Sequence, residues 1–124
     1  MVKKIMVVDD SATIRMSLKT VLTNAGFEIV QASDGEEALK MLQDGTKPDL
    51  IITDINMPKM GGLELIKNVR KLPGLRFVPI LALTTESAQE KRDEARKNGA
   101  TGWIVKPVKG AELLGVIKKV LPEM

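Results

Sequence analysis

The sequence contains no cysteine and no histidine. The absence of cysteine excludes disulfides, thiolate metal sites and thiol nucleophiles. The absence of histidine removes the commonest general base and the commonest transition-metal ligand. A metal ion held by this chain would therefore be bound by oxygen, which favours magnesium or calcium.

Aromatic residues are also scarce, at 2% of 124 residues with no tyrosine, so stacking platforms for single-stranded nucleic acid are missing. The formal net charge of +3 is too small to indicate nucleic-acid binding by itself. No apolar run approaches the roughly 20 residues of a membrane span, and a strand pattern begins at once without a signal peptide. We therefore expect a cytoplasmic protein that binds neither nucleic acid nor membrane.

The residues that are present suit a globular protein, with 44% hydrophobic and 28% charged. The length is that of one domain, which we expect to span residues 1–124. Short apolar runs of strand type alternate five times with helical patterns. The alternation indicates an α/β protein, with a parallel sheet, helices on both faces and right-handed crossovers. We expect strands at residues 5–8, 27–32, 50–54, 78–83 and 102–105.

Capping residues precede several of the expected helices. Asp10 and Ser11 both offer caps for the first helix, which Gly26 ends in a left-handed conformation. Ser33 with Glu36, and later Ser87 with Glu90, have the spacing of a capping box.

The helix expected over residues 87–98 differs from the others because its apolar residues are only Ala88 and Ala95. So little apolar area lowers the cost of local opening. We expect it to be the least protected helix.

Unusual polar residues follow the predicted strands at their carboxyl ends. Because these ends meet at one edge of a parallel sheet, we expect the side chains to converge there. Three converging carboxylates repel one another, and a hard divalent cation such as Mg²⁺ would compensate them. The residues concerned are Asp9, Asp10, Asp54, Thr84 and Lys106.

Asp54 is the carboxylate that can act as a nucleophile and form an aspartyl phosphate. Lys106 supplies a point charge for a phosphate oxygen, and Thr84 supplies a hydroxyl donor. Taken singly, these residues have ordinary interpretations as a helix cap, a solvated lysine and a turn residue. Their occurrence together at one edge favours a phosphate site.

The chain resembles the receiver domains of two-component response regulators, including the single-domain chemotaxis regulators. The resemblance covers essentially the whole chain. It rests on Asp9-Asp10, on Asp54 followed by Met57-Pro58, on Thr84 and on Lys106-Pro107. It implies a flavodoxin-like, doubly wound, five-stranded parallel sheet with strand order 2-1-3-4-5 and five helices.

The resemblance also implies a role for each site residue. Asp54 would be the phosphoacceptor. Mg²⁺ would be held by Asp10, Asp54 and the backbone carbonyl of Asn56, with Asp9 acting mainly through water. Lys106 would pair with the phosphoryl group and form a cis bond to Pro107, and Thr84 would hydrogen-bond the phosphoryl group and move towards it.

Two positions depart from the usual receiver pattern. Trp103 occupies the aromatic switch position, where tyrosine or phenylalanine is usual, and we expect its ring to swing from solvent inward on activation. Gly61 stands where many receivers have aspartate, which loosens that loop without touching a chemical role.

The resemblance implies a histidine kinase as phosphodonor and a protein target on the face of the fourth helix, fifth strand and fifth helix. A flagellar motor switch protein is the expected target, and a phosphatase is a further possible partner. We expect a monomer that catalyses only its own phosphorylation and dephosphorylation. The alternative within the family is a stand-alone receiver in a phosphorelay outside chemotaxis.

Two other classes share some of these features. An aspartate-nucleophile phosphatase of the haloacid-dehalogenase type also combines Asp, Thr, Lys and magnesium. It needs a second aspartate where this chain has Asn56, and the chain lacks room for a cap domain. A flavodoxin-like electron carrier would cradle a phosphate where Asp9 and Asp10 would repel one, and the colour of the purified protein would test that alternative.

Overall fold

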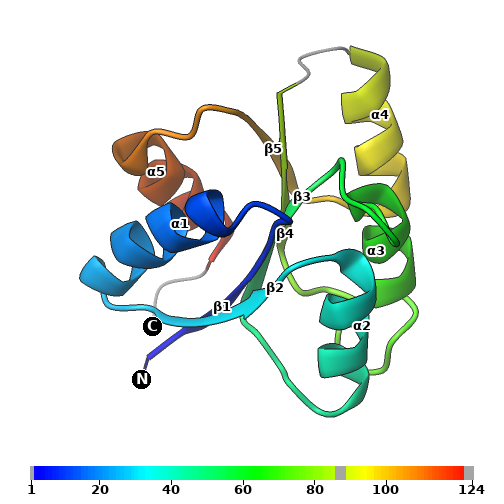
Figure 1. Ribbon diagram of the computed structural model, residues 1–124. Coiled ribbons are helices and arrows are strands. Elements are labelled where there is room, and N and C mark those ends of the chain that lie inside the picture. Colours follow the sequence, from blue (N-terminus) through cyan, green and yellow to red (C-terminus); the bar gives the residue numbers. More distant parts are fainter. Residues whose placement is uncertain (1, 86–88, 122–124) are drawn as a thin grey trace.

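The computed structural model describes residues 2–85 and 89–121. Its five strands form one parallel sheet in the order β2-β1-β3-β4-β5, as expected for a flavodoxin-like fold (Figure 1). The strands are β1 (Lys4–Val8), β2 (Glu28–Ala32), β3 (Leu50–Asp54), β4 (Ile80–Thr84) and β5 (Gly102–Val105). The helices are α1 (Ala12–Asn24), α2 (Gly35–Gln43), α3 (Gly62–Val69), α4 (Gln89–Asn98) and α5 (Gly110–Val120).

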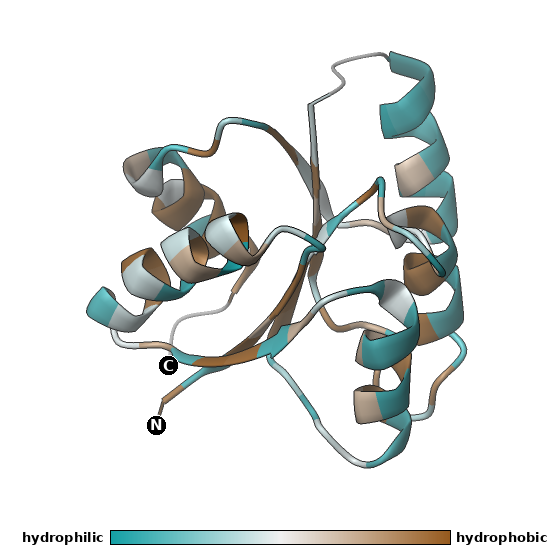
Figure 2. Ribbon diagram, in the orientation of Figure 1, coloured by the Kyte–Doolittle hydropathy of each residue, from teal (hydrophilic) through white to brown (hydrophobic). Residues whose placement is uncertain are grey.

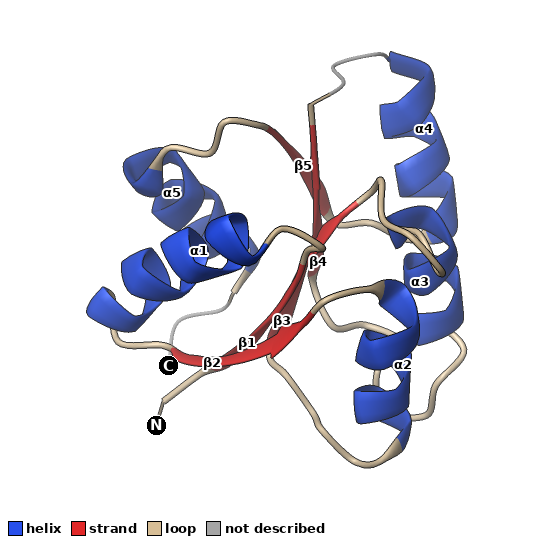
Figure 3. Ribbon diagram, in the orientation of Figure 1, coloured by secondary structure: helices blue, strands red, loops and turns tan. Residues whose placement is uncertain are grey.

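The helices form two layers, with α1 and α5 on one face of the sheet and α2, α3 and α4 on the other (Figure 3). Successive strand residues point to opposite faces, so neighbouring residues of β3 enter different cores. Ile51 packs in the core beneath α2 and α3, whereas Ile52 packs in the core beneath α1 and α5. All five residues of β3 are buried because helices cover both faces (Figure 2).

The start of α2 differs by one residue from the expected capping box of Ser33 and Glu36. Asp34 is the N-cap, and its side chain accepts a hydrogen bond from the Glu37 N–H at 2.8 Å. The Glu37 carboxylate in turn accepts from the Ser33 N–H at 2.8 Å. The following contact explains the shift: the Gly35 N–H donates to the Met60 carbonyl at 3.1 Å, and a β-carbon at Gly35 would collide with that carbonyl.

Some of the other expected boundaries of helices and strands agree with the structure and others do not. Ser11 is the N-cap of α1, and Gly26 follows that helix with a φ of +97°. β4 begins at Ile80 rather than Val78, since Pro79 has no N–H to donate to the ladder. The expected cap Ser87 and the apolar Ala88 lie outside the described residues. Within the described range of α4, Ala95 is buried.

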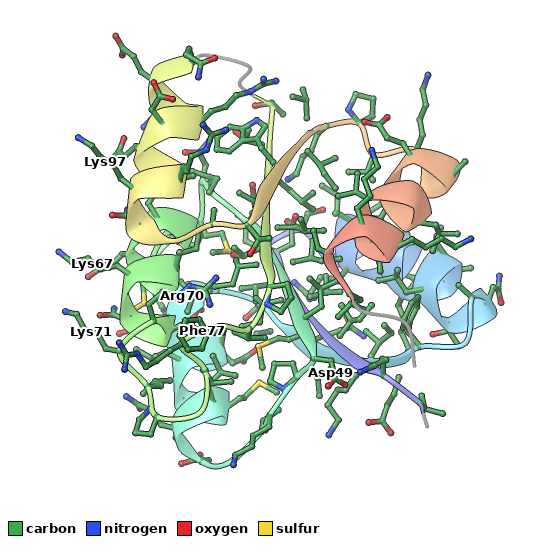
Figure 4. The ribbon with its side chains drawn as sticks, turned by 180° about the vertical axis from the view of Figure 1, so that it is seen from behind. Asp49, Lys67, Arg70, Lys71, Phe77 and Lys97 are labelled. Carbon is green, nitrogen blue, oxygen red and sulfur yellow. The ribbon has the colours of Figure 1, made fainter. Side chains whose placement is uncertain are left out.

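Arg70 joins three segments at the amino ends of β4 and β5. Figure 4 shows Lys67, Lys71 and Lys97 pointing away from the fold, whereas Arg70 turns inward. Its guanidinium donates to the Gly99 carbonyl from Nε at 3.1 Å and from Nη2 at 2.7 Å. Nη1 donates to the carbonyls of Leu75, Arg76 and Val78 at 3.3, 3.2 and 2.6 Å. One side chain therefore fixes the end of α3 against the segments entering β4 and β5.

None of the helices in the described part of the chain is long and apolar enough to cross a membrane.

Candidate functional site at the carboxyl ends of the strands

Side chains from three strands meet at the carboxyl edge of the sheet. Asp9 directly follows β1, Asp54 is the last residue of the neighbouring β3, and Lys106 directly follows β5. Lys106 Nζ lies 3.1 Å from Asp9 Oδ2 and 3.2 Å from Asp54 Oδ1, so the lysine reaches past β4. Its backbone N–H donates to the Thr84 carbonyl at 2.8 Å, and its peptide bond to Pro107 is cis.

The two carboxylates that face Lys106 are held in place by neighbouring backbone groups. Asp9 is fully buried, and its Oδ1 accepts a hydrogen bond from the Ser11 N–H at 2.9 Å. The Asp9 carbonyl accepts from Arg15 Nη1 at 2.6 Å. Asp54 is also buried, and its Oδ1 accepts from the Ile55 N–H at 2.9 Å. Both carboxylates are therefore oriented before any ligand binds.

The electrostatic balance of this edge is negative. Burial, together with the charge of Asp9, raises the pKa of Asp54, and Lys106 and the Ile55 N–H offset only part of that rise. Burial by itself would lower the pKa of Lys106, but its hydrogen bond to Asp9 and the two carboxylate charges raise the pKa above its ordinary value. One ammonium group thus serves two buried carboxylates, and a further cation is favoured here.

A third carboxylate completes a set of ligands suited to such a cation. Asp9, Asp10 and Asp54 each offer a carboxylate oxygen, and these atoms lie within 4.8 Å of one another. Asp10 is exposed whereas the other two are buried, so the group opens to solvent on the Asp10 side. An all-oxygen, acidic donor set fits Mg²⁺. Asn56 is exposed two residues beyond Asp54, and the ligand role of its carbonyl stays a prediction.

The two expected switch residues lie on β4 and β5. Thr84 ends β4, is 1% exposed and pairs in register with Val105. Trp103 pairs with Ala82 and packs against the core beneath α2 and α3. Trp103 is partly buried in this structure. The switch roles of Thr84 and Trp103 stay predictions.

Gly62 is a positioning residue that the sequence did not single out. A β-carbon at Gly62 would collide with the Asp54 carbonyl, and the Gly62 N–H donates to the Ile55 carbonyl at 2.9 Å. At Gly61 the nearest atom to such a β-carbon would be the Ile55 carbonyl, at 3.1 Å. From the sequence, the glycine pair only predicts a turn. The structure shows that Gly62 is the glycine that the site requires, because it packs against the Asp54 carbonyl.

The chain belongs to the response regulator receiver domain family, whose model matches residues 5–118. It is 40% identical over 122 residues to the chemotaxis protein CheY-3 of Vibrio cholerae, covering 98% of this chain and 93% of that protein. Among solved structures, chemotaxis protein CheY4 of Vibrio cholerae superposes with a TM-score of 0.93 at 45% identity, covering 98% of this chain and 100% of that one.

A third comparison bears on the metal. The receiver domain of a sensor histidine kinase from Pseudomonas aeruginosa superposes with a TM-score of 0.88 at 25% identity, covering 97% of this chain and 98% of that one. That structure is described with a magnesium ion coordinated in its active-site cleft. The acidic group of Asp9, Asp10 and Asp54 here is of the kind that suits the same ion.

Proposed function

We propose that this protein is a phosphorylation-driven signalling switch in which Asp54 accepts a phosphoryl group from a histidine kinase. The observation that carries the proposal is the position of Lys106 Nζ, 3.1 Å from Asp9 and 3.2 Å from Asp54, in a buried edge that keeps an excess of negative charge. That arrangement supports a nucleophile, a cation site and a phosphate-binding ammonium in one place.

The side chains have distinct roles in the transfer. A carboxylate oxygen of Asp54 forms a bond to phosphorus while the bond from phosphorus to the kinase imidazole nitrogen breaks. Burial and the charge of Asp9 destabilise the ionised Asp54, which makes its carboxylate a better nucleophile. Lys106 then pairs with a phosphoryl oxygen, and the Thr84 hydroxyl donates to another. Bound Mg²⁺, held by Asp10, Asp54 and the Asn56 carbonyl, with Asp9 acting mainly through water, would supply neutralising charge.

The output is a protein contact rather than a reaction on another substrate. The protein promotes only its own phosphorylation and later hydrolysis, by positioning and electrostatics. Movement of Thr84 and Trp103 would transmit the change to the face of α4, β5 and α5. The chemotaxis names of its relatives support a cytoplasmic, monomeric relay to the flagellar motor switch.

The Asp54→Asn variant tests the proposal. We expect magnesium-dependent labelling by radioactive acetyl phosphate to be lost, because the amide is no nucleophile towards phosphorus. Asp49→Asn is the matched control, since Asp49 precedes the same strand at its other end, where it accepts from the Lys4 N–H at 2.8 Å. Labelling of Asp54→Asn at the wild-type rate would refute the assignment, and Asp49→Asn should be labelled normally.

A further inference from the structure

The side chain of Arg15 reaches from α1 back to the acidic edge of the sheet. Arg15 lies in the first turn of α1, which follows β1 after a short connection (Figure 1). It is half-buried, and its Nη1 donates to the Asp9 carbonyl at 2.6 Å. Its backbone N–H donates to the Ser11 carbonyl at 3.0 Å. Both the side chain and the backbone of Arg15 therefore hold the segment that carries Asp9 and Asp10.

The carbonyl that Arg15 holds belongs to the peptide bond between Asp9 and Asp10. Because a peptide unit is planar, fixing its oxygen fixes the orientation of the plane from which Asp10 projects. Asp9 has further contacts, since its N–H donates to the Ala32 carbonyl at 3.1 Å and its Oδ1 accepts from the Ser11 N–H at 2.9 Å. Arg15 thus adds little to the position of Asp9 and acts mainly on Asp10.

The Asp10 carboxylate has no comparable support. Asp10 is exposed, and its side chain forms no hydrogen bond or ion pair with any described residue. Yet ligand oxygens of Asp9, Asp10 and Asp54 lie within 4.8 Å of one another. Like charges this close repel one another, and an exposed side chain is free to turn away into solvent. The held peptide plane is therefore the contact that keeps the backbone of Asp10 in the orientation that a cation site needs.

The guanidinium group of Arg15 suits this task because it contacts a carbonyl and no carboxylate. Arg15 forms no ion pair with any residue that the structure describes, so it occupies none of the carboxylate oxygens that a cation would use. A charged donor makes a stronger hydrogen bond than a neutral one, and arginine stays charged at physiological pH. Lys106 differs, since its ammonium group contacts Asp9 and Asp54 directly. Arg15 can therefore hold the loop with or without a bound cation.

We propose that Arg15 is a positioning residue of the cation site, which holds the peptide between Asp9 and Asp10 so that the Asp10 carboxylate faces Asp54 before Mg²⁺ binds. This inference rests on the proposed function in that Mg²⁺ is the ion used in phosphorylation. Arg15 acts through Asp10 and touches neither the ion nor the phosphoryl group. A ligand that is oriented in advance loses less conformational freedom on binding, so the affinity for the ion is higher.

Calorimetry of the metal-free protein with MgCl₂ tests the proposal through the sign of the effect. Electrostatics alone predicts that removing a positive charge near a cation site strengthens Mg²⁺ binding, whereas loss of positioning predicts the reverse. We expect Arg15→Met, which removes the charge and the donor but keeps an unbranched stem, to weaken Mg²⁺ binding about fivefold, less than removal of the Asp10 ligand itself. Lys19→Met is the control, because Lys19 is exposed on the same helix, and it should bind Mg²⁺ at least as tightly as wild type.

A second comparison separates positioning from a general effect on the fold. In the Asp10→Ala background the carboxylate that Arg15 positions is absent, so Arg15→Met should leave the remaining Mg²⁺ affinity unchanged. A loosened fold would lower the affinity by the same factor in both backgrounds. Arg15→Lys keeps a charged donor and should restore part of the affinity. The backbone amide resonances of each variant report whether it is folded, and Arg15→Gln replaces Arg15→Met in the comparison if the latter does not fold.

Unchanged or stronger Mg²⁺ binding by Arg15→Met, or an equal loss of affinity in the wild-type and Asp10→Ala backgrounds, would overturn the proposal. The measurement needs no phosphoryl group, so its failure is distinguishable from failure of the proposed function. Unchanged Mg²⁺ binding by Arg15→Met with normal labelling of Asp54 overturns the positioning role alone. The expected loss of Mg²⁺ affinity without labelling of Asp54 overturns the phosphoacceptor assignment and leaves the positioning role in place.

Discussion

Two cations are partly withdrawn from solvent at opposite ends of the same sheet. Arg70, at the amino ends of β4 and β5, donates to four backbone carbonyls, which carry no net charge. Lys106, at the carboxyl ends, faces the carboxylates of Asp9 and Asp54. Burial lowers the pKa of Arg70, whereas the carboxylates overcome burial and raise the pKa of Lys106.

The difference separates a structural cation from one that belongs to a site. Neutral carbonyls accept from Arg70, and no carboxylate of the described residues pairs with it, so its contacts hold backbone segments together. At the other end the carboxylates outnumber the ammonium group, and the pKa of Asp54 is raised as a result of burial and of Asp9. Unbalanced charge of this kind is typical of functional sites. The comparison predicts that substitutions at the two ends will differ in their dependence on pH and on magnesium.

The largest effect is expected at Arg70. Arg70→Ala should lower the free energy of unfolding by about 3 kcal/mol, because several carbonyls lose a charged donor at once. The loss should be the same with and without magnesium, since no carboxylate faces Arg70 in the described structure. Urea denaturation measures it, with Lys71→Ala as the exposed control expected within about 0.5 kcal/mol of wild type. Equal stability of the two variants would show that solvent replaces the guanidinium at no cost.

Asp54→Asn should raise the free energy of unfolding, whereas Arg70→Ala lowers it. The folded-state pKa of Asp54 lies above the unfolded value, so its ionised form costs stability once the pH exceeds both values. Without magnesium, Asp54→Asn should therefore be more stable than wild type by about 1 kcal/mol near neutral pH. The gain should shrink as the pH falls through the raised pKa and vanish below the ordinary value of 3.8, where the wild-type carboxyl is protonated.

Urea denaturation at a series of pH values tests this prediction, with Asp49→Asn as the control at the other end of the strand. A pH-independent difference, or a less stable Asp54→Asn at neutral pH, would show that Lys106 compensates both carboxylates fully.

Substitution of Asp10 should weaken magnesium binding without changing the stability of the metal-free protein. Asp10 is the exposed member of the acidic group, so Asp10→Ala should leave the metal-free stability within about 0.5 kcal/mol of wild type. Its magnesium affinity should fall about tenfold, which corresponds to roughly 1.4 kcal/mol for a lost ligand. Titration calorimetry measures the affinity, and Arg70→Ala should keep the wild-type value if it remains folded. Unchanged affinity of Asp10→Ala would exclude a direct ligand role.

The smallest effect is expected in local opening of α4. Ala95 is the buried residue in its described range, whereas α1 buries Leu18 and Leu22. Amides of α4 should therefore exchange with solvent faster than those of α1 in the unmodified protein. Because Arg70 holds the Gly99 carbonyl directly after α4, Arg70→Ala should accelerate exchange in the last turn of α4 more than in α1. Faster exchange in α1 than in α4 would contradict the prediction.

Part of the candidate site follows from the sequence for a topological reason. Asp9, Asp54 and Lys106 each stand where an apolar strand pattern ends, and a parallel sheet brings such positions to one edge. Their convergence therefore needs no knowledge of side-chain packing. The start of α2, in contrast, cannot be predicted without knowledge of packing. Ser33 with Glu36 and Asp34 with Glu37 have the same spacing in the sequence, so both pairs could form the capping box. The contact of Gly35 with Met60 decides between them.

By itself, then, the sequence determined the order of the elements, their arrangement in a parallel sheet and the sheet edge at which the candidate site lies. The reason is that the periodicity of hydrophobic residues and the residues at strand ends are local signals. Only the tertiary structure distinguished Arg70 from the exposed Lys71 beside it. Only it showed that Arg15 donates to the backbone of the acidic edge, whereas Lys19 stays exposed. In both cases the acceptor is a backbone carbonyl, which every residue carries and no side-chain pattern marks. Burial and hydrogen-bond satisfaction are therefore fixed when the elements pack, and no local pattern encodes them.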